Sequence, residues 1–172
     1  LSGLYPDHGG QVLVNGEPAA LETPARAKSQ GIQTVHQRVD EAVVPGLSVA
    51  ENLLFEKIAA GEKGTSGSLG SLLPEARKVA AALSLDWSDR FLRKDAYELD
   101  IADQQLLTLA RAVVDKPSLL VLDEPTSALS ATEVDNLMVV IRSLRDQGVG
   151  ILYVSHRLSE VDAIADHLVV LR

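Results

Sequence analysis

Hydrophobic positions form two kinds of pattern in the last third of the chain. Short continuous apolar runs of strand length alternate there with longer stretches in which apolar residues recur at helical spacing. Ser130 and Glu133 mark the start of one such helix with a capping-box pattern, and Gly148 marks its end. Buried strands that alternate with helices are typical of a parallel sheet, which we predict here. The predicted strands cover 118–122, 150–154 and 167–171, and the predicted helices cover 130–147 and about 158–165.

The start of the chain predicts shorter elements. Alternating polar and apolar residues at 11–16 end in an Asn-Gly pair and predict a strand and a turn. Thr23 and Pro24 have the pattern of a helix N-cap and first helical position, and Gly31 provides the stop. A further strand is expected at 32–35.

The segment from about 39 to 116 differs from both ends because its pattern is mostly helical. Ser48 and Glu51 form a second capping-box pattern, and a Gly- and Ser-rich stretch at 61–71 predicts a flexible connection. We interpret this segment as an insertion into the α/β part. Its expected helices cover 49–58, 74–85 and about 106–114.

The predicted strand at 118–122 leads directly into two carboxylates, Asp123 and Glu124. Open α/β sheets bind their ligands at the carboxyl ends of their strands. There Asp123 would hold Mg²⁺ through a water molecule, and Glu124 would polarise an attacking water. The plainer alternative is a strand that ends in acidic turn residues.

The residues around this pair resemble the ATP-binding subunits of ABC transporters. The resemblance spans nearly the whole chain in order and spacing. Leu119–Glu124 is similar to the Walker B motif, Leu99–Gln105 to the ABC signature, Ser127–Ser130 to the D-loop, His156 to the switch histidine and Gln37 to the Q-loop glutamine.

The resemblance implies an ATPase that uses ATP and Mg²⁺. It gives Glu124 and His156 catalytic roles and makes Asp123 and Gln37 the candidate metal-contacting residues. A histidine suits contact with a phosphate because it titrates near neutral pH. For Gln37 the alternative is an ordinary loop glutamine, and for His156 a structural histidine. The implied nucleotide-contacting residues are Gln37, Asp100, Ile101, Ala102, Asp103, Gln104, Ser127, Ala128 and Leu129.

A narrower resemblance is to the first ATPase half of tandem importers for monosaccharides of the ribose, galactose and xylose type. It is carried by Val35-His36-Gln37, by 44–54 and by Ser155–Glu160. The implied location is the cytoplasmic face of the cell membrane, as a peripheral protein. The implied partners are a second ATPase half, transmembrane permease subunits and, indirectly, a periplasmic or extracellular sugar-binding protein. The residues 44–55 would face the permease, or would form a plain surface helix.

The implied fold is an α/β P-loop NTPase domain of the ABC type, with a mostly parallel sheet and an inserted helical subdomain. We expect 1–38 and 117–172 to form a partial RecA-like core and 39–116 to form the helical subdomain that carries the signature.

The expected phosphate-binding loop, Walker A, does not occur in the sequence. A Gly-Lys-Ser/Thr string is absent, Leu1–Tyr5 resembles the end of the helix that follows such a loop, and the single methionine is Met138. We therefore expect a domain that is truncated at its N-terminus, with an exposed sheet edge. The full-length parent should be an ATPase, and this fragment alone should be inactive. Calorimetry should detect no micromolar ATP binding to it.

The signature departs from the family pattern at Asp100, where serine is usual, and at Ala102, where glycine is usual. Aspartate is as good an N-cap as serine. However, this helix N-terminus should point at a phosphate bound to the opposing subunit. Two like charges about 4 Å apart repel by roughly 4 kcal/mol at an effective dielectric near 20. We hypothesise a weakened ATP site.

Composition limits the alternatives. With 16 Lys and Arg against 24 Asp and Glu, the net charge is −8, which argues against non-specific nucleic-acid binding. The absence of cysteine excludes disulfides and thiolate metal sites. One alternative is a non-catalytic regulatory module of the ABC fold with a degenerate ATP site. A second, a DNA-maintenance ATPase, is disfavoured because no coiled coil or cysteine module lies between Gln37 and Leu99.

Overall fold

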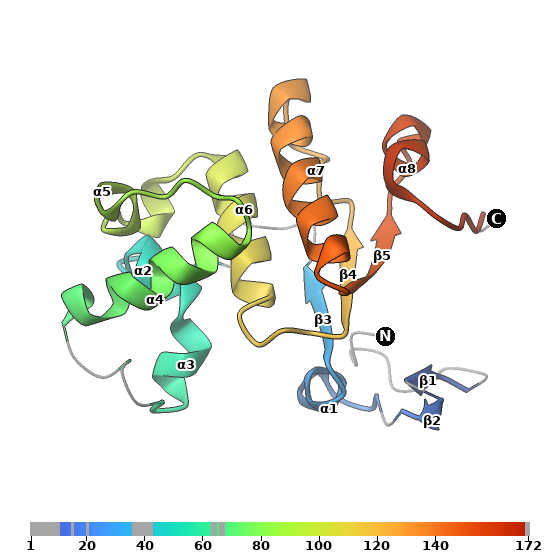
Figure 1. The fold of residues 1–172 in the computed structure, drawn as a ribbon, viewed down its shortest axis with the longest axis horizontal. Helices are drawn as coiled ribbons and strands as arrows, with labels where there is room; N and C mark the ends of the chain where they lie inside the picture. The colour runs from blue at the N-terminus through green and yellow to red at the C-terminus, as the bar shows by residue number, and fades with distance from the viewer. Residues whose placement is uncertain are drawn as a thin grey trace.

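The computed structural model describes residues 11–14, 16–19, 21–35, 43–62, 65 and 68–170. In this part of the chain, a group of helices lies on one side and a three-stranded sheet with its own helices lies on the other (Figure 1). The helix α7 (Ala131–Asp146) stands between the two groups in this view. The fold is α/β, as predicted.

The sheet is parallel and consists of β3 (Ile32–Val35), β4 (Leu119–Asp123) and β5 (Gly150–Val154) in the order β3-β4-β5. The register pairs Val35 with Leu122, and Leu122 with Tyr153. This pairing brings the carboxyl ends of all three strands to the same edge. The parallel sheet and these three strands confirm the sequence prediction.

Two predictions about strands are wrong. The strand β5 is not buried, because exposure alternates along it and Leu152 and Val154 are 42% and 44% exposed. Residues 150, 152 and 154 point to the same face of the sheet, and this face is less covered than the opposite one. The strand expected at 167–171 is irregular over residues 167–170, where Leu168, Val169 and Val170 are exposed. An apolar run forms a strand only with a partner, and these three residues pair with none of the described strands.

The elements before β3 are determined by residues with turn and helix-cap preferences. The strands β1 (Leu13–Val14) and β2 (Glu17–Pro18) form an antiparallel hairpin, and Asn15 of the predicted turn lies outside the described residues. Helix α1 (Pro24–Ser29) begins as predicted, with the Thr23 side chain accepting a hydrogen bond from a backbone N–H. Gly31 ends this region at φ +78°, and a Cβ there would lie 3.0 Å from the Ser118 hydroxyl. Both observations require glycine at this position.

The helical group differs from the prediction mainly in its boundaries. The helix expected at 49–58 is divided at Leu54, and the helix expected from Pro74 begins five residues earlier, since Gly70 and Ser71 are helical rather than part of a linker. The two shortest helices of this group, Asp89–Leu92 and Ala96–Glu98, were not predicted, because three or four residues show no helical periodicity. The helices of this group are α2 (Val49–Leu53), α3 (Phe55–Ala59), α4 (Leu69–Ala82), α5 (Asp89–Leu92), the 3-10 helix η1 (Ala96–Glu98) and α6 (Ile101–Ala112), and α8 (Leu158–Ile164) follows β5 as predicted.

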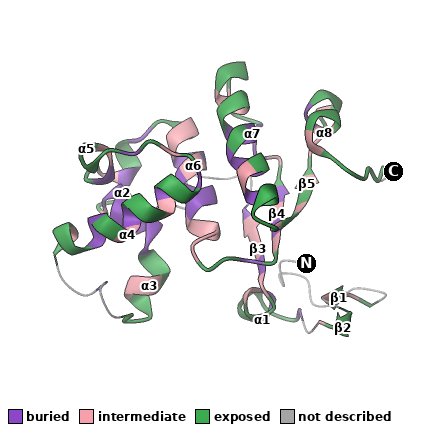
Figure 2. Cartoon of the chain, viewed as in Figure 1, coloured by how far each residue is buried: buried purple, intermediate pink, exposed green. Residues whose placement is uncertain are grey.

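One hydrophobic core joins the helical group to the sheet. It includes Leu53 of α2, Leu107 of α6, Leu120 of β4 and Leu144 of α7, all of them buried. Buried positions line α2, α4, α6 and α7, whereas β5 and α8 are mostly intermediate or exposed (Figure 2). Because the core is continuous, the position of the α6 N-terminus relative to the sheet is fixed by packing. No helix in the described ranges is both long enough and apolar enough to cross a bilayer.

Asn52 fixes the segment that leads into α2. Its side chain is fully buried; its Oδ1 accepts from the Val44 N–H at 2.8 Å, and its Nδ2 donates to the carbonyls of Val44, Leu47 and Ser48 at 3.1–3.2 Å. We expect Asn52→Leu to lower the free energy of unfolding by about 2–4 kcal/mol, because these backbone groups would lose their partner.

Denaturation in urea measures this effect. Ser68→Ala is the control, because the Ser68 side chain makes no capping hydrogen bond and a change below about 0.5 kcal/mol is expected there. Equal effects of the two substitutions would contradict the role given to Asn52.

Candidate functional site

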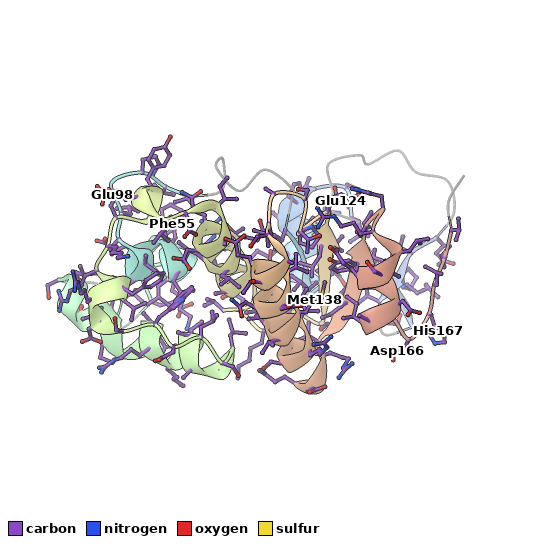
Figure 3. The ribbon with its side chains drawn as sticks, turned by 90° about the horizontal axis from the view of Figure 1, so that it is seen from above. Phe55, Glu98, Glu124, Met138, Asp166 and His167 are labelled. Atoms are coloured by element: carbon purple, nitrogen blue, oxygen red, sulfur yellow. The ribbon has the colours of Figure 1, made fainter. Side chains whose placement is uncertain are left out.

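The two carboxylates predicted at the end of β4 lie at the carboxyl edge of the sheet. Asp123 is the last residue of the strand and is exposed, and Glu124 follows in the left-handed region at φ +49°. A non-glycine residue in this region is uncommon and strained, and such strain clusters at functional sites. The Glu124 N–H donates to the Val154 carbonyl at 2.9 Å, so the turn is attached to the end of β5. Figure 3 labels Glu124 in the half of the molecule that holds the sheet.

His156 meets Glu124 across this edge. Its Nδ1 lies 2.8 Å from Glu124 Oε1, and the two side chains are 73% and 22% exposed respectively. An ionised carboxylate can only accept a hydrogen bond, so Nδ1 carries the proton in this contact. The ring is therefore oriented by Glu124, and within the part of the chain that the structure describes its Nε2 has no hydrogen-bond partner. In this pair Glu124 can accept a proton from water, and His156 provides a polar group beside it.

The turn that follows Glu124 contains the predicted D-loop residues. Ser127 and Ala128 are exposed, and Leu129 packs against the core. Two backbone hydrogen bonds close the turn, from the Ser127 N–H to the Glu124 carbonyl and from the Leu129 N–H to the Thr126 carbonyl. These residues are thus next to the Glu124–His156 pair in space as well as in sequence.

The predicted signature residues form the first turn of α6. Asp100 is the N-cap and accepts a hydrogen bond from the Asp103 N–H at 2.8 Å, as predicted for an aspartate at this position. Asp100 and Ile101 are exposed, and Ala102 and Asp103 are partly buried. Gln104 is buried, and its Nε2 donates to the carbonyls of Tyr97 and Leu99 at 3.3 and 3.2 Å. Its side-chain amide therefore holds the preceding loop against the helix.

The N-terminus of α6 is a region of negative charge. Burial raises the pKa of the Asp103 carboxyl, the carboxylates of Asp100 and Glu133 raise it further, and Lys94 opposes them. Glu133, in the first turn of α7, thus adds to the negative charge that acts on Asp103.

The candidate residues fall into two sets. One set lies at the sheet edge and consists of Asp123, Glu124, His156 and the 127–129 turn. The other, Asp100–Gln104, forms the N-cap and first turn of α6 in the helical group. Gln37 lies outside the described residues. Within the described ranges, no three His, Asp or Glu side chains cluster closely enough to hold a metal ion by themselves. The exposed carboxylate of Asp123 is an oxygen donor of the kind that Mg²⁺ prefers, so it fits a water-mediated contact in which substrate phosphates supply other ligands.

A polar cluster that the sequence pattern did not predict lies close to this edge. Thr126, Tyr153 and Glu160 come from three separate elements and share hydrogen bonds. Their sequence spacing has no recognisable pattern, because only the parallel pairing of β4 with β5 brings them together. An acidic residue in the first turn of α8 has the ordinary pattern of a helix start.

Three features together define a class of nucleotide-binding domain. They are a strand that ends in paired carboxylates, a histidine at the end of the adjacent parallel strand, and a capped signature helix. The family model described as "ABC transporter" matches residues 1–127. The chain belongs to this family.

Relatives in sequence include ribose import ATP-binding proteins. The ribose import ATP-binding protein of Burkholderia pseudomallei (strain K96243) is 37% identical over 175 residues, which cover 100% of this chain and 33% of the relative. That of Corynebacterium glutamicum is 37% identical over 172 residues, covering 100% of this chain and 32% of the relative. The chain thus spans about a third of the length of the curated relatives it matches.

Solved structures share the fold. The protein cbiO1 from Clostridium perfringens, described as part of the ABC transporter complex cbiONQ, aligns with a TM-score of 0.72 at 18% identity over 94% of this chain and 62% of that chain. The ADP conformation of the ATP-binding cassette MJ1267 aligns with a TM-score of 0.70 at 23% identity over 93% of this chain and 64% of that chain. At these identities the likeness supports the fold alone.

Proposed function

We propose that the chain is part of an ATP-binding and ATP-hydrolysing subunit that energises import of a sugar through an ABC transporter. The observation that carries this proposal is the 2.8 Å contact between His156 Nδ1 and Glu124 Oε1 at the carboxyl edge of the sheet. The names of the relatives, which are ribose import ATP-binding proteins, support ribose or a similar monosaccharide as the cargo.

In this proposal Glu124 acts on the attacking water. Its carboxylate accepts a proton from the water as the water approaches the γ-phosphate of ATP, and such assistance contributes about 10²–10⁴-fold to a rate. Its strained backbone and its hydrogen bond to β5 hold the carboxylate at the sheet edge before ATP arrives. His156 is oriented through Nδ1, and with both ring nitrogens protonated its Nε2–H would donate a hydrogen bond to a γ-phosphate oxygen. Asp123 would hold Mg²⁺ through water, and the ion would neutralise phosphate charge.

The remaining candidate residues would complete a site shared by two ATPase halves. Asp100, Ile101, Ala102, Asp103 and Gln104 would face the ATP bound to the second half, and Ser127, Ala128 and Leu129 would line the contact between the halves. Gln37 would reach the same metal and water from the segment after β3. We assign 1–38 and 117–172 to the RecA-like core and 39–116 to the helical subdomain. This division is supported by the strands, which lie outside 39–116 in the described ranges.

The surface around α2 and α3 would receive the permease subunits. Phe55 is 39% exposed there, and Figure 3 labels it in the helical half, away from Asp166 and His167. The subunit would be peripheral on the cytoplasmic face of the membrane, and a sugar-binding protein would act through the permease.

Sugar uptake in living cells tests this proposal. Deleting the gene should abolish uptake of at least one labelled ribose-type sugar, and restoring the intact gene should recover it. The purified transporter should hydrolyse ATP faster when the loaded binding protein is present. Unchanged uptake of all such sugars together with no ATP hydrolysis would overturn the proposal.

A non-catalytic regulatory module is the second candidate, and the acidic α6 N-terminus favours it. Asp100 and Asp103 would repel a phosphate that a serine would accept. The two candidates differ in one observable: a regulatory module would bind its partners and show no ATP turnover in the assembled complex.

A further inference from the structure

A single buried carboxylate connects the two loops that carry Glu124 and His156. Glu160, in the first turn of α8, is 8% exposed. Its Oε2 accepts from the hydroxyl of Thr126 at 2.7 Å and from the hydroxyl of Tyr153 at 2.8 Å, and its Oε1 accepts from Arg157 Nη1 at 3.1 Å. Each oxygen of the carboxylate therefore has a partner.

The partners of Glu160 are close in sequence to the site residues. Thr126 is two residues after Glu124, in the turn that follows β4, and its side chain is fully buried. Tyr153 lies in β5, three residues before His156. The Arg157 N–H donates to the Ser155 hydroxyl at 3.0 Å and closes a local turn around His156, and the Ser155 hydroxyl itself lies 3.5 Å from Glu160 Oε2. Glu160 thus connects the turn that follows Glu124 to the end of β5 that leads to His156.

The charge state of Glu160 supports this role. Burial by itself raises the pKa of the Glu160 carboxyl, but the hydrogen bonds from Thr126, Tyr153 and Arg157 together hold the pKa below its usual value of 4.5. The contribution of Glu160 to stability is therefore complete above about pH 4.5 and is lost as the pH falls through the lowered pKa. Burial, followed by the hydrogen bond to Glu160, raises the pKa of Tyr153, which keeps this hydroxyl protonated as a donor.

We propose that Glu160 is a positioning residue: by binding the Thr126 and Tyr153 hydroxyls at once, it sets the distance between Glu124 and His156. A carboxylate suits this role because one oxygen can accept from two donors, whereas an apolar residue would leave two buried hydroxyls without a partner. The inference rests on the proposed ATPase function for its kinetic consequence. The placement of the two loops is independent of that function.

Kinetics in the full-length protein, assembled with its permease, test the consequence. Glu160→Gln keeps the shape of the side chain and loses the charge, and it should lower kcat for ATP about ten-fold or more, with little change in KM. Thr126→Val should have a similar effect, and Thr126→Ser, which keeps the hydroxyl, should restore kcat. Asp162→Asn is the matched control, because Asp162 is exposed on the same helix and should leave kcat unchanged.

A double-mutant cycle separates positioning from general stability. If Glu160 acts through Glu124 and His156, adding Glu160→Gln to a protein that already carries His156→Ala should lower kcat only slightly further. Independent, multiplicative losses, or a kcat equal to that of the wild-type protein, would overturn the inference. Cooperative thermal unfolding of each variant would show that it is folded, with a lower melting temperature expected for Glu160→Gln because the hydrogen bonds to the carboxylate are weakened.

Hydrogen exchange tests the inference even if the wild-type protein hydrolyses no ATP. The absence of hydrolysis would count against the proposed function and not against the placement of the two loops. Glu160→Gln should speed exchange in peptides that cover the closing bonds of the 124–129 turn, and should leave peptides from the middle of α7 unchanged. Unaltered exchange in the turn would overturn the inference. This readout also reports on variants too unstable for kinetics, since exchange would then rise throughout the chain rather than in the turn.

Discussion

Replacing Glu124 by Gln is expected to lower ATP turnover of the assembled transporter by about 10²–10⁴-fold. Glutamine matches the shape of glutamate but cannot accept a proton from water. ATP binding should be retained, because the substitution removes a negative charge close to the expected phosphate. Phosphate release measures turnover, and filter binding of labelled ATP measures affinity.

The control for this prediction is Glu62→Gln, which makes the same chemical change at an exposed position after α3. It should leave turnover unchanged. If Glu124→Gln retained wild-type turnover, Glu124 would not be the general base, and the strained turn at φ +49° would need another explanation.

Asp100→Ser is expected to raise ATP turnover at least ten-fold under conditions where ATP is limiting. Serine caps a helix as well as aspartate does, so α6 should still begin at Ile101. The substitution removes a charge that would repel a phosphate by roughly 4 kcal/mol at 4 Å and an effective dielectric near 20, and a rise of ten-fold needs only about a third of that energy.

The same substitution should also lower the pKa of Asp103, because the Asp100 carboxylate is one of the groups that raise it. Asp95→Ser is a suitable control: Asp95 caps the neighbouring 3-10 helix by accepting from the Tyr97 N–H, so it makes a comparable local hydrogen bond outside the signature. Unchanged turnover after Asp100→Ser would contradict the idea that this charge weakens the site.

Local signals in the sequence were enough to predict most helix starts and the central strands. The capping boxes at Ser48 and Ser130, the Thr23–Pro24 start and the Asp100 N-cap all have side chains that bond within three residues, so their consequences are visible in the sequence. The apolar runs predicted β4 and β5 because parallel strands need such residues.

Features that depend on distant pairing were not predictable. The exposure of Leu152 depends on what packs over that face of β5, and the irregular path of 167–170 depends on whether a strand pairs with it. An apolar pattern carries no such information. The cluster of Thr126, Tyr153 and Glu160 likewise arises from the β4–β5 register. The family resemblance implied catalytic roles for Glu124 and His156, and their contact with each other became visible only in the structure.

ATP-driven sugar uptake by the purified transporter in lipid vesicles tests the central claim most directly. With ATP on the side that holds the ATPase subunits and the loaded sugar-binding protein on the other, the account predicts that the wild-type transporter accumulates sugar while it releases phosphate. The Glu124→Gln transporter should do neither, although it should still bind ATP. Sugar accumulation by the Glu124→Gln transporter at the wild-type rate would contradict the account.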